Sequence, residues 1–208
     1  MIVIIDCGTG NVGSVFNMLR KLGESAVVSS EISAIEKADR LILPGTGSFD
    51  IGMGRLHDSG LIPVLDERVI GAKVPVLGIC LGMQLFTGSS EEGTLQGLGW
   101  LEARTVKFRF EKNRTDLKVP HMGWNTVMAK AGNPLFAGLD VGARFYFVHS
   151  YHLVCDDESN VTSRTCHGYE FVSSVQKGNI TGVQFHPEKS HKFGLRLLKN
   201  FVGMGHHA

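Results

Sequence analysis

A chain of 208 residues with 43% hydrophobic content is long enough for one ordinary globular domain and too short for two large ones. Its 21 basic and 20 acidic residues are mixed in sign along the sequence, which excludes the clustered positive charge typical of nucleic-acid or membrane-surface binding. No apolar run reaches the roughly 18 residues that span a bilayer, and the N-terminus has no signal-peptide pattern. We expect a cytoplasmic protein with a single domain over residues 1–208 and with neither nucleic acid nor membrane as a partner.

The cysteines and histidines form no recognisable disulfide or metal-binding pattern. Four cysteines without a CxxC spacing are too sparse for a disulfide scaffold, and the nine histidines include no HExxH motif. We therefore expect no metal and no cofactor, and we interpret Cys7, Cys155 and Cys166 as buried thiols. His206 and His207 at the tail are assigned no function.

The first half of the chain alternates short apolar runs with segments of helical periodicity. The expected strands are Ile2–Ile5, Ala26–Val28, Leu41–Leu43 and Val76–Ile79. Apolar residues at helical spacing occur between them, at Val15–Leu22, Ile32–Ile35 and Leu61–Leu65. Strands that alternate with helices indicate βαβ units, and unbroken apolar strands are typical of a parallel sheet buried on both faces.

After about Gly97 the pattern changes to strands joined by short turns. The expected strands are Thr105–Phe110, Thr126–Met128, Arg144–Val148, Val161–Cys166, Glu170–Val175 and Ile180–Phe185. They favour antiparallel pairs added to the parallel sheet, and apolar residues at helical spacing predict a closing helix over Ser190–Val202. The predicted fold class is α/β, with a mostly parallel central sheet flanked by helices and additional antiparallel strands in the second half.

A glycine-rich turn follows the first expected strand. Gly8, Gly10 and Gly13 match the G-x-G-x-x-G fingerprint of dinucleotide-binding domains. The alternative is a tight turn in which Asn11 or Ser14 caps the next helix. The motif alone is weak evidence for a nucleotide site. The rest of the chain weakens that interpretation further, because it supplies only one such half and contains a second group of motifs that nucleotide binding does not explain.

Cys80 stands between Gly78 and Gly82, after an apolar strand and at the start of a helical segment. A nucleophile elbow has this G-x-C-x-G layout, because glycines on both sides remove side chains that would collide with strand and helix. A helix N-terminus favours the reactive thiolate, and the backbone N–H of Leu81 can meet a developing oxyanion. The alternative is a buried cysteine in a glycine-rich strand end; the two glycines favour the elbow.

A base for this thiol is offered by His186, with Glu188 two residues later. Extended backbone would send both side chains to one face, and Pro187 biases His186 toward extended geometry. His186 would then take the proton of Cys80 while Glu188 orients the imidazole ring. An isolated tripeptide of this kind would be a solvated surface turn; beside the elbow it predicts a catalytic triad.

The segment Pro44–Gly47 follows the expected strand Leu41–Leu43. Two glycines after a buried strand let the backbone approach a ligand closely and can direct N–H groups at an anion. A plain loop is equally consistent with this segment alone. With the elbow and the triad in the same chain, an oxyanion-hole strand is the better interpretation.

These motifs together resemble those of the class I, or triad, glutamine amidotransferases. Gly78–Gln84 and His186–Glu188 carry the resemblance to the class. It narrows to the glutaminase subunits of imidazole glycerol phosphate synthase through Asp6–Val15, Pro44–Gly47, Val119–Asn125, Phe145–Tyr151 and His186–Ser190. These segments run from residue 6 to residue 190 and so cover nearly the whole chain.

The resemblance implies an activity and the residues that perform it. Cys80 would attack the side-chain amide of L-glutamine, and His186, oriented by Glu188, would protonate the departing ammonia and then activate water. The implied oxyanion contacts are Leu81, Thr46 and Gly47, and the implied glutamine pocket consists of Gln84, His149, Ser150 and Tyr151. Relatives often carry an apolar β-branched residue at position 46, and Thr46 keeps that shape.

The resemblance also implies a partner. The ammonia would pass to a cyclase subunit of (β/α)₈ type, in a heterodimer that makes imidazole glycerol phosphate and aminoimidazole carboxamide ribotide in histidine biosynthesis. Asn11, Trp124 and Lys189 would face the cyclase, although Trp124 would also suit a core position. We expect slow hydrolysis by the isolated chain, because the N–H groups of Pro44–Gly47 can point away from the oxyanion until the partner binds.

Three alternative functions stay open at this point. The first is the glutaminase subunit of another synthase, such as that of pyridoxal 5′-phosphate, with the same triad and a different partner. The second is a dinucleotide-binding domain built on the glycine-rich turn. The third is a catalytically silent binding protein that keeps the fold, against which the complete set of Cys80, His186 and Glu188 argues.

Overall fold

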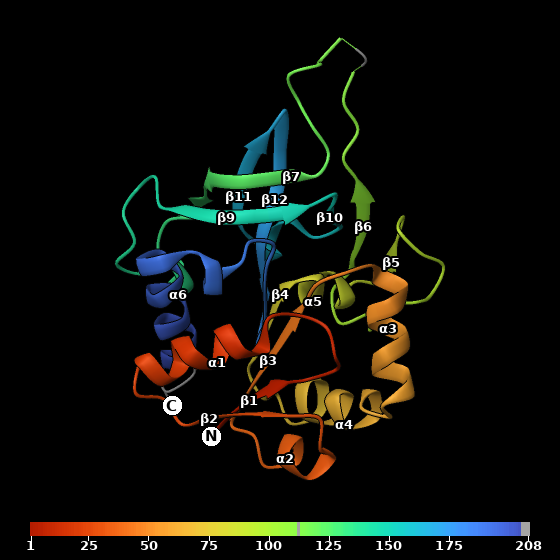
Figure 1. The fold of residues 1–208 in the computed structure, drawn as a ribbon, viewed down its shortest axis with the longest axis vertical. Helices are drawn as coiled ribbons and strands as arrows, with labels where there is room; N and C mark the ends of the chain where they lie inside the picture. The colour runs from red at the N-terminus through yellow and green to blue at the C-terminus, as the bar shows by residue number, and fades with distance from the viewer. Residues whose placement is uncertain (112, 205–208) are drawn as a thin grey trace.

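A mixed β-sheet runs through the centre of the computed structural model, which describes residues 1–111 and 113–204 (Figure 1). Its main path is β2-β1-β3-β4-β13-β12-β10-β6-β5, and the first five strands are parallel. They are β1 (Ile2–Ile5), β2 (Ala26–Ser29), β3 (Arg40–Gly45), β4 (Val76–Cys80) and β13 (Ile180–Val183). The predicted α/β fold with a mostly parallel central sheet is confirmed.

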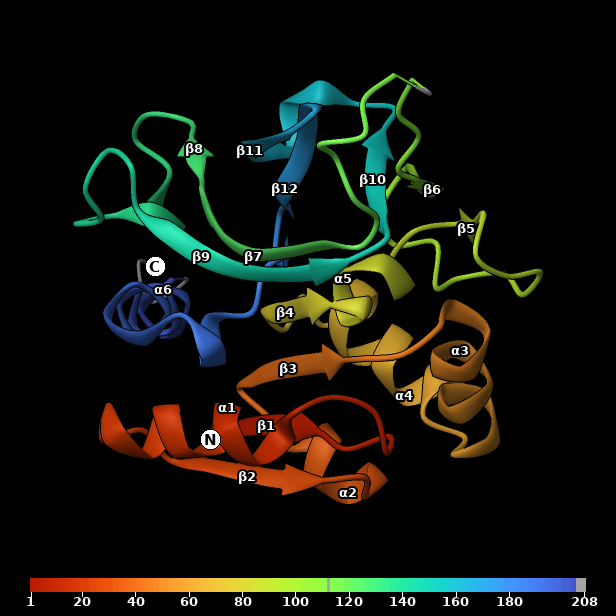
Figure 2. The ribbon, with the colours of Figure 1, turned by 45° about the horizontal axis from the view of Figure 1, so that its top comes forward.

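Helices pack on both faces of the parallel strands (Figure 2). Each face has its own cluster of buried apolar side chains. Ile2 and Ile4 of β1 pack on the face covered by α1 (Val12–Lys21) and α6 (His191–Gly203). Val3 and Ile5 pack on the other face, against α2 (Ile32–Glu36), α3 (Phe49–Asp58) and α4 (Ile62–Asp66), which a π-helical turn at Glu67–Gly71 follows. Successive side chains of a strand leave on opposite faces, so β1 contributes to both cores.

The second half of the chain extends this sheet with antiparallel strands. They are β6 (Ala103–Lys107), β8 (Met128–Ala129), β10 (Tyr151–Cys155), β11 (Val161–His167) and β12 (Tyr169–Lys177), and the short β5 (Ser89–Ser90) runs parallel to β6. A separate two-stranded sheet pairs β7 (His121–Thr126) with β9 (Arg144–His149). The described residues also form 3₁₀ turns at Pro134–Phe136, Glu158–Asn160 and Pro187–Lys189. The predicted antiparallel additions are therefore present.

Several predicted element bounds differ from those of the structure. The last strand, β13, ends at Val183 and pairs in parallel with β4 as well as antiparallel with β12, so it belongs to the parallel sheet. The expected strand at 126–128 is divided between the end of β7 and the start of β8. The sequence pattern does not predict β7, β10 or α3. Polar residues and glycine obscure the alternation of β7, and Gly52 and Gly54 lower the helix propensity of α3.

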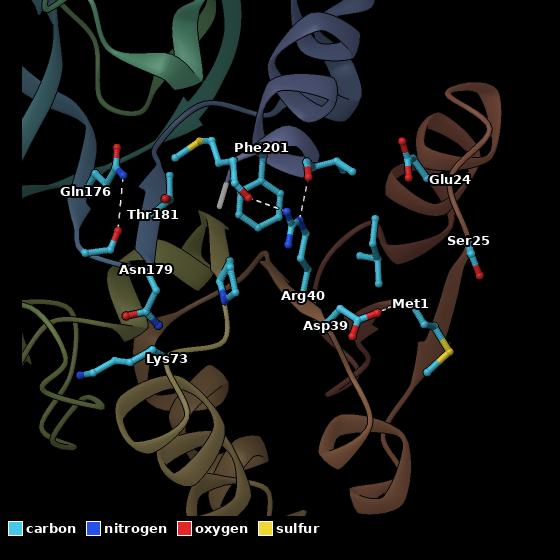
Figure 3. Close-up of a pocket in the computed structure, with 15 residues that line it drawn as sticks. Met1, Glu24, Ser25, Asp39, Arg40, Lys73, Gln176, Asn179, Thr181 and Phe201 are labelled. Carbon is cyan, nitrogen blue, oxygen red and sulfur yellow. Dashed lines mark hydrogen bonds and ion pairs between the residues drawn. The ribbon is translucent and has the colours of Figure 1, made fainter. Parts of the chain in front are cut away.

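A cavity of about 750 Å³ opens at the amino ends of the parallel strands (Figure 3). Arg40, at the start of β3, lies beside the C-terminal end of α6: its Nε donates to the carbonyl of Val202 at 2.8 Å and its Nη2 to that of Met204. The last carbonyls of a helix have no partner inside the helix, so this guanidinium satisfies them. No helix among the described residues combines the length and apolar character needed to cross a membrane.

Candidate active site

Cys80 ends β4 in a strained backbone conformation, with φ 54° and ψ −109°, and α5 (Leu81–Leu85) begins directly after it. A positive φ is unfavourable for a residue with a Cβ atom and is typical of nucleophile elbows. The flanking glycines are required sterically. A Cβ atom on Gly82 would lie 1.8 Å from the carbonyl oxygen of Leu43, and one on Gly78 would lie 2.6 Å from the ring of Phe86.

The imidazole of His186 is hydrogen-bonded to Glu188, with 2.8 Å between Nδ1 and Oε1, and both side chains are almost fully buried. The route by which they meet differs from the predicted one. His186 itself is extended, at φ −102° and ψ 97°, but Pro187–Lys189 forms a 3₁₀ turn, so the expectation of extended backbone through Glu188 is wrong. The turn, started by the fixed φ of Pro187, folds the carboxylate back to the ring.

The electrostatics of this pair favour a charged imidazole. Burial opposes protonation of His186, but the neighbouring Cys80 side chain and the Glu188 carboxylate outweigh it and raise the pKa of His186 to about 10. A protonated imidazole beside a cysteine is the arrangement that stabilises a thiolate. Among the described residues, His186 Nε2 and Glu188 Oε2 are buried and make no hydrogen bond. Most buried polar atoms in folded proteins are paired, so these two are unusual.

A second cavity, of about 300 Å³, opens at the carboxyl ends of the parallel strands beside the elbow. Its lining consists of Thr46, Gly47, Cys80, Leu81, Gln84, Glu92, Pro120, Val148, His149, Ser150, Tyr151 and His186. All the predicted oxyanion and glutamine-pocket residues thus surround one hollow together with the predicted nucleophile and base. Glu188 lies outside this lining, on the far side of the His186 ring.

Gln84 is bound to the protein through its side chain. Its Nε2 donates to the carbonyl of Tyr151 at 3.1 Å and to Oε1 of Gln184 at 3.0 Å. Gln184 in turn directs its Nε2 at Cys80 Sγ, 3.6 Å away. The sequence interpretation missed Gln184, and the signal for it was a polar residue in an otherwise apolar strand end, just before His186.

Glu92 is a second residue that the sequence interpretation missed. Its carboxylate lines the cavity and accepts a hydrogen bond from the backbone N–H of Phe49 at 2.9 Å. Burial raises the pKa of Glu92. In the sequence it stands beside Glu91 in a short acidic run, which is typical of a solvated surface, so no local pattern marks it.

The glycine-rich N-terminal turn packs against the predicted oxyanion segment. The backbone N–H of Gly10 donates to Thr46 Oγ1 at 3.2 Å, and a Cβ atom on Gly10 would lie 2.8 Å from the carbonyl of Pro44. Gly47 has a φ of 104°, which favours glycine. Leu81 is the first residue of α5, so its amide has no acceptor within the helix. Asn11 caps α1 by accepting from the N–H of Ser14, as the alternative to a nucleotide site predicts.

The residues predicted to face a partner lie at the surface. The Trp124 side chain is 38% exposed and stacks on His191, with 5.4 Å between ring centroids. Lys189 is exposed, and its ammonium lies 5.7 Å from the centroid of the Tyr146 ring. Asn11 is exposed at the start of α1, which contacts the 3₁₀ turn that carries Lys189. A fully buried core position for Trp124 is therefore not what the structure shows.

The remaining cysteines do not behave as one group. Cys7 is buried, but Cys155 is only half-buried and Cys166 is exposed, so the expectation of three buried thiols is wrong for both. Burial raises the pKa of Cys155 to about 11. No group of three or more His, Cys, Asp or Glu side chains suited to a metal ion occurs in residues 1–111 and 113–204. His206 and His207 lie outside the described residues.

The family model described as "Glutamine amidotransferase class-I" matches residues 3–204. This chain belongs to the class-I glutamine amidotransferase family. Three relatives of this amidotransferase are named as HisH subunits of imidazole glycerol phosphate synthase. That of Methanococcus maripaludis is 53% identical, with 97% of this chain and 98% of the relative covered. Those of Pseudomonas aeruginosa and Sulfurimonas denitrificans are each 48% identical, with 97% of this chain covered and 98% and 97% of the relatives.

Solved structures agree on the fold of the amidotransferase. A crystal structure described as a glutamine amidotransferase superposes with a TM-score of 0.73 at 22% identity, covering 98% of each chain. A chain of PurLQS from Thermotoga maritima superposes with a TM-score of 0.70 at 18% identity, covering 97% of each chain. At these identities the likeness establishes the architecture only.

Proposed function

We propose that this amidotransferase is the glutaminase subunit of an imidazole glycerol phosphate synthase, which hydrolyses L-glutamine and supplies ammonia to a cyclase subunit in histidine biosynthesis. The observation that carries the proposal is the buried pair of His186 and Glu188 beside the strained Cys80, at a cavity lined by oxyanion and pocket residues. The choice of synthase is supported by the 48–53% identity to three HisH subunits, which extends over nearly the full length of the chain. Neither a dinucleotide-binding domain nor a catalytically silent binding protein would explain why Cys80, His186 and Glu188 lie together.

Hydrolysis begins with the Cys80 thiolate. It attacks the side-chain carbonyl carbon of glutamine, and the carbonyl oxygen becomes an oxyanion held by the amides of Leu81 and the Thr46–Gly47 segment. Protonated His186 then gives its Nε2 proton to the departing nitrogen, so that ammonia leaves and a γ-glutamyl thioester remains. Nε2 is free for this transfer because it makes no hydrogen bond among the described residues, while Glu188 holds Nδ1.

The second half of the reaction reverses these roles. Neutral His186 takes a proton from water, the hydroxide attacks the thioester carbonyl, and the tetrahedral intermediate collapses to glutamate and the Cys80 thiolate. Glu188 stabilises the imidazolium each time it forms. In the cavity, the carboxylate of Glu92 supplies the negative charge that the α-ammonium of glutamine requires, and the backbone and side chains of Ser150 and Tyr151 form the facing wall.

The ammonia is used by a partner. We propose that the cyclase is a (β/α)₈ subunit, that the two chains form a heterodimer in the cytoplasm, and that Asn11, Trp124 and Lys189 contact the cyclase. An exposed tryptophan with a neighbouring cation is typical of interface anchors. Because Gly10 is bonded to Thr46, a partner that contacts the N-terminal turn would also act on the oxyanion segment, so hydrolysis by the isolated chain is expected to be slow.

The test is the Cys80→Ala variant, assayed with its cyclase subunit. We expect glutamine-dependent synthesis to fall by on the order of 10³-fold or more, because Cys80 is the one thiol among the described residues that line the cavity. Synthesis from added ammonium should continue at the wild-type rate. The matched control is Cys155→Ala, which removes a thiol outside the cavity and should leave both reactions unchanged.

Two outcomes would contradict the proposal. Glutamine-dependent synthesis that survives Cys80→Ala would exclude the triad, and loss of the ammonium reaction would mean that Cys80 has a structural role. Co-purification with candidate cyclases separates imidazole glycerol phosphate synthase from the pyridoxal 5′-phosphate alternative. If glutamine turnover is coupled only to a pyridoxal synthase, the assignment of the partner is wrong while the glutaminase chemistry stands.

A further inference from the structure

A continuous series of hydrogen bonds connects strand β7 with the nucleophile. It starts at Asn125, whose Nδ2 lies 3.1 Å from His121 Nε2, and continues through 3.0 Å between His121 Nδ1 and His149 Nε2. His149 Nδ1 lies 2.7 Å from the carbonyl oxygen of Tyr151. The same carbonyl accepts from Gln84, which leads through Gln184 to Cys80 Sγ.

The direction of every bond in this series is determined. The Tyr151 carbonyl can only accept, so His149 carries its proton on Nδ1. A neutral ring then has a bare Nε2, which must accept, so His121 donates from its own Nδ1. His121 Nε2 must therefore accept from the amide of Asn125. The orientation of that amide is fixed independently, because its oxygen accepts from the N–H of Thr126 at 2.8 Å and its nitrogen donates to the carbonyl of Cys166 at 2.8 Å.

Both imidazoles are neutral in this environment, which the assignment requires. Burial, with like charge on His167 adding to it, lowers the pKa of His121 to about 4. Burial lowers the pKa of His149 well below its ordinary value. Aromatic rings surround the pair, with Phe147 and Phe171 both packed against His121. These apolar rings offer no hydrogen-bond partner to a ring nitrogen, so each imidazole depends on the polar groups of the series for its hydrogen bonds.

We propose that His121 is a positioning residue for glutamine hydrolysis: its Nδ1–H holds His149, and through the Tyr151 carbonyl it fixes the wall of the glutamine pocket and the Gln84–Gln184 amides beside Cys80. The inference rests on the proposed glutaminase function and extends it to a strand that does not contact substrate. His121 and Asn125 lie on the face of β7 that joins the hydrogen-bond series. Met122 and Trp124 lie on the opposite face, at the surface, and are 62% and 38% exposed. The placement of β7 therefore sets the geometry of the pocket.

The test compares two variants of the same size, His121→Asn and His121→Leu. Both remove the imidazole ring and its packing equally, but the asparagine amide can donate from near the position of Nδ1 and leucine cannot. With L-glutamine as substrate, we expect kcat/KM of His121→Leu to fall about 10-fold or more, because His149 Nε2 becomes a buried acceptor without a partner. His121→Asn should stay within about threefold of wild type. The loss in His121→Leu should appear mainly as a raised KM, since a partly unfolded sample would lower kcat and leave KM unchanged.

A spectroscopic measurement on the wild-type chain does not depend on either variant folding. Two-bond ¹H–¹⁵N spectra of histidine-labelled protein should show both His121 and His149 as the Nδ1–H tautomer. An Nε2–H tautomer at His121 would overturn the inference, and so would equal losses in the two variants. If the wild-type chain with its cyclase releases no glutamate, the glutaminase proposal fails instead, while the spectra still decide whether the series of bonds exists.

Discussion

Two cavities lie at opposite ends of the same parallel strands, and the proposed active site is at the smaller one. The cavity at the amino ends is about 750 Å³ and contains charged side chains, yet its buried cation, Arg40, is bonded to the last carbonyls of α6 (Figure 3). The cavity at the carboxyl ends is about 300 Å³ and is lined by His186, and both His186 Nε2 and Oε2 of the neighbouring Glu188 are buried without partners. The two cavities are therefore distinguished by whether the buried polar groups beside them have hydrogen-bond partners, and not by their volumes.

The difference has a physical cause. A buried polar atom without a partner costs free energy, so one that lies beside a cavity is a candidate for use by a substrate or a reaction step. Arg68 Nε and Thr165 Oγ1 are also buried and unpaired among the described residues, but they line neither cavity. Backbone strain does not follow this division: Cys80 has a positive φ at the carboxyl end, with its flanking glycines packed against backbone, and Lys73 has a positive φ beside the larger cavity. Substitutions at the smaller cavity, and then at the larger one, can break this contrast.

The largest effect is expected from Glu188→Gln. The amide keeps the shape of the carboxylate but loses the charge that stabilises imidazolium, and it can donate to Nδ1 and reverse the tautomer of His186. We expect glutamine hydrolysis to fall roughly 10³-fold, with ammonium-dependent synthesis retained. Initial rates with each nitrogen source measure this. A loss below about tenfold would mean that the buried pair does not mark the reactive cavity.

The same variant has a stability signature with a defined sign. The pKa of His186 is raised from about 6.5 to about 10 in the folded protein, so protonated His186 stabilises the fold. This contribution is complete below about pH 6.5 and is lost as the pH rises through about 10. The difference in the free energy of unfolding between wild type and Glu188→Gln should therefore shrink from neutral to alkaline pH. A difference that grows with pH would contradict the ion pair.

A smaller effect, on stability, is expected from Gly82→Ala. The added Cβ atom would meet the carbonyl of Leu43, a backbone atom that cannot move aside cheaply, so we expect about 3 kcal/mol of destabilisation and loss of the elbow. Urea unfolding measures it. The matched control is Gly54→Ala in α3, where nothing lies within 4 Å of the added atom, and it should gain up to about 1 kcal/mol. Similar values for the two would remove the steric argument.

The part of this site that could be predicted from sequence is the part carried by local pattern. Cys80 between two glycines and the pair of His186 and Glu188 are short motifs whose chemistry follows from spacing. Glu92 reaches the cavity, and Gln184 reaches Cys80, only through long-range contacts of the fold. The one local sign of Gln184 was a polar residue at an apolar strand end, and Glu92 had none. The 3₁₀ turn at Pro187 shows the same limit, because spacing predicts that two side chains meet but not the backbone path that joins them.

The smallest effect is expected at the larger cavity, from Arg40→Met. Methionine keeps the apolar stem and removes the donors to Val202 and Met204, so α6 loses the partner of its last carbonyls. We expect about 1–2 kcal/mol of destabilisation in urea and an unchanged rate of glutamine hydrolysis. Lys73→Met is the control: Lys73 lines the same cavity but is exposed, and its substitution should stay within about 0.5 kcal/mol of wild type. If Arg40→Met instead lowered hydrolysis with no change in stability, the larger cavity would have a part in function, and unpaired polar atoms would no longer distinguish the two ends of the sheet.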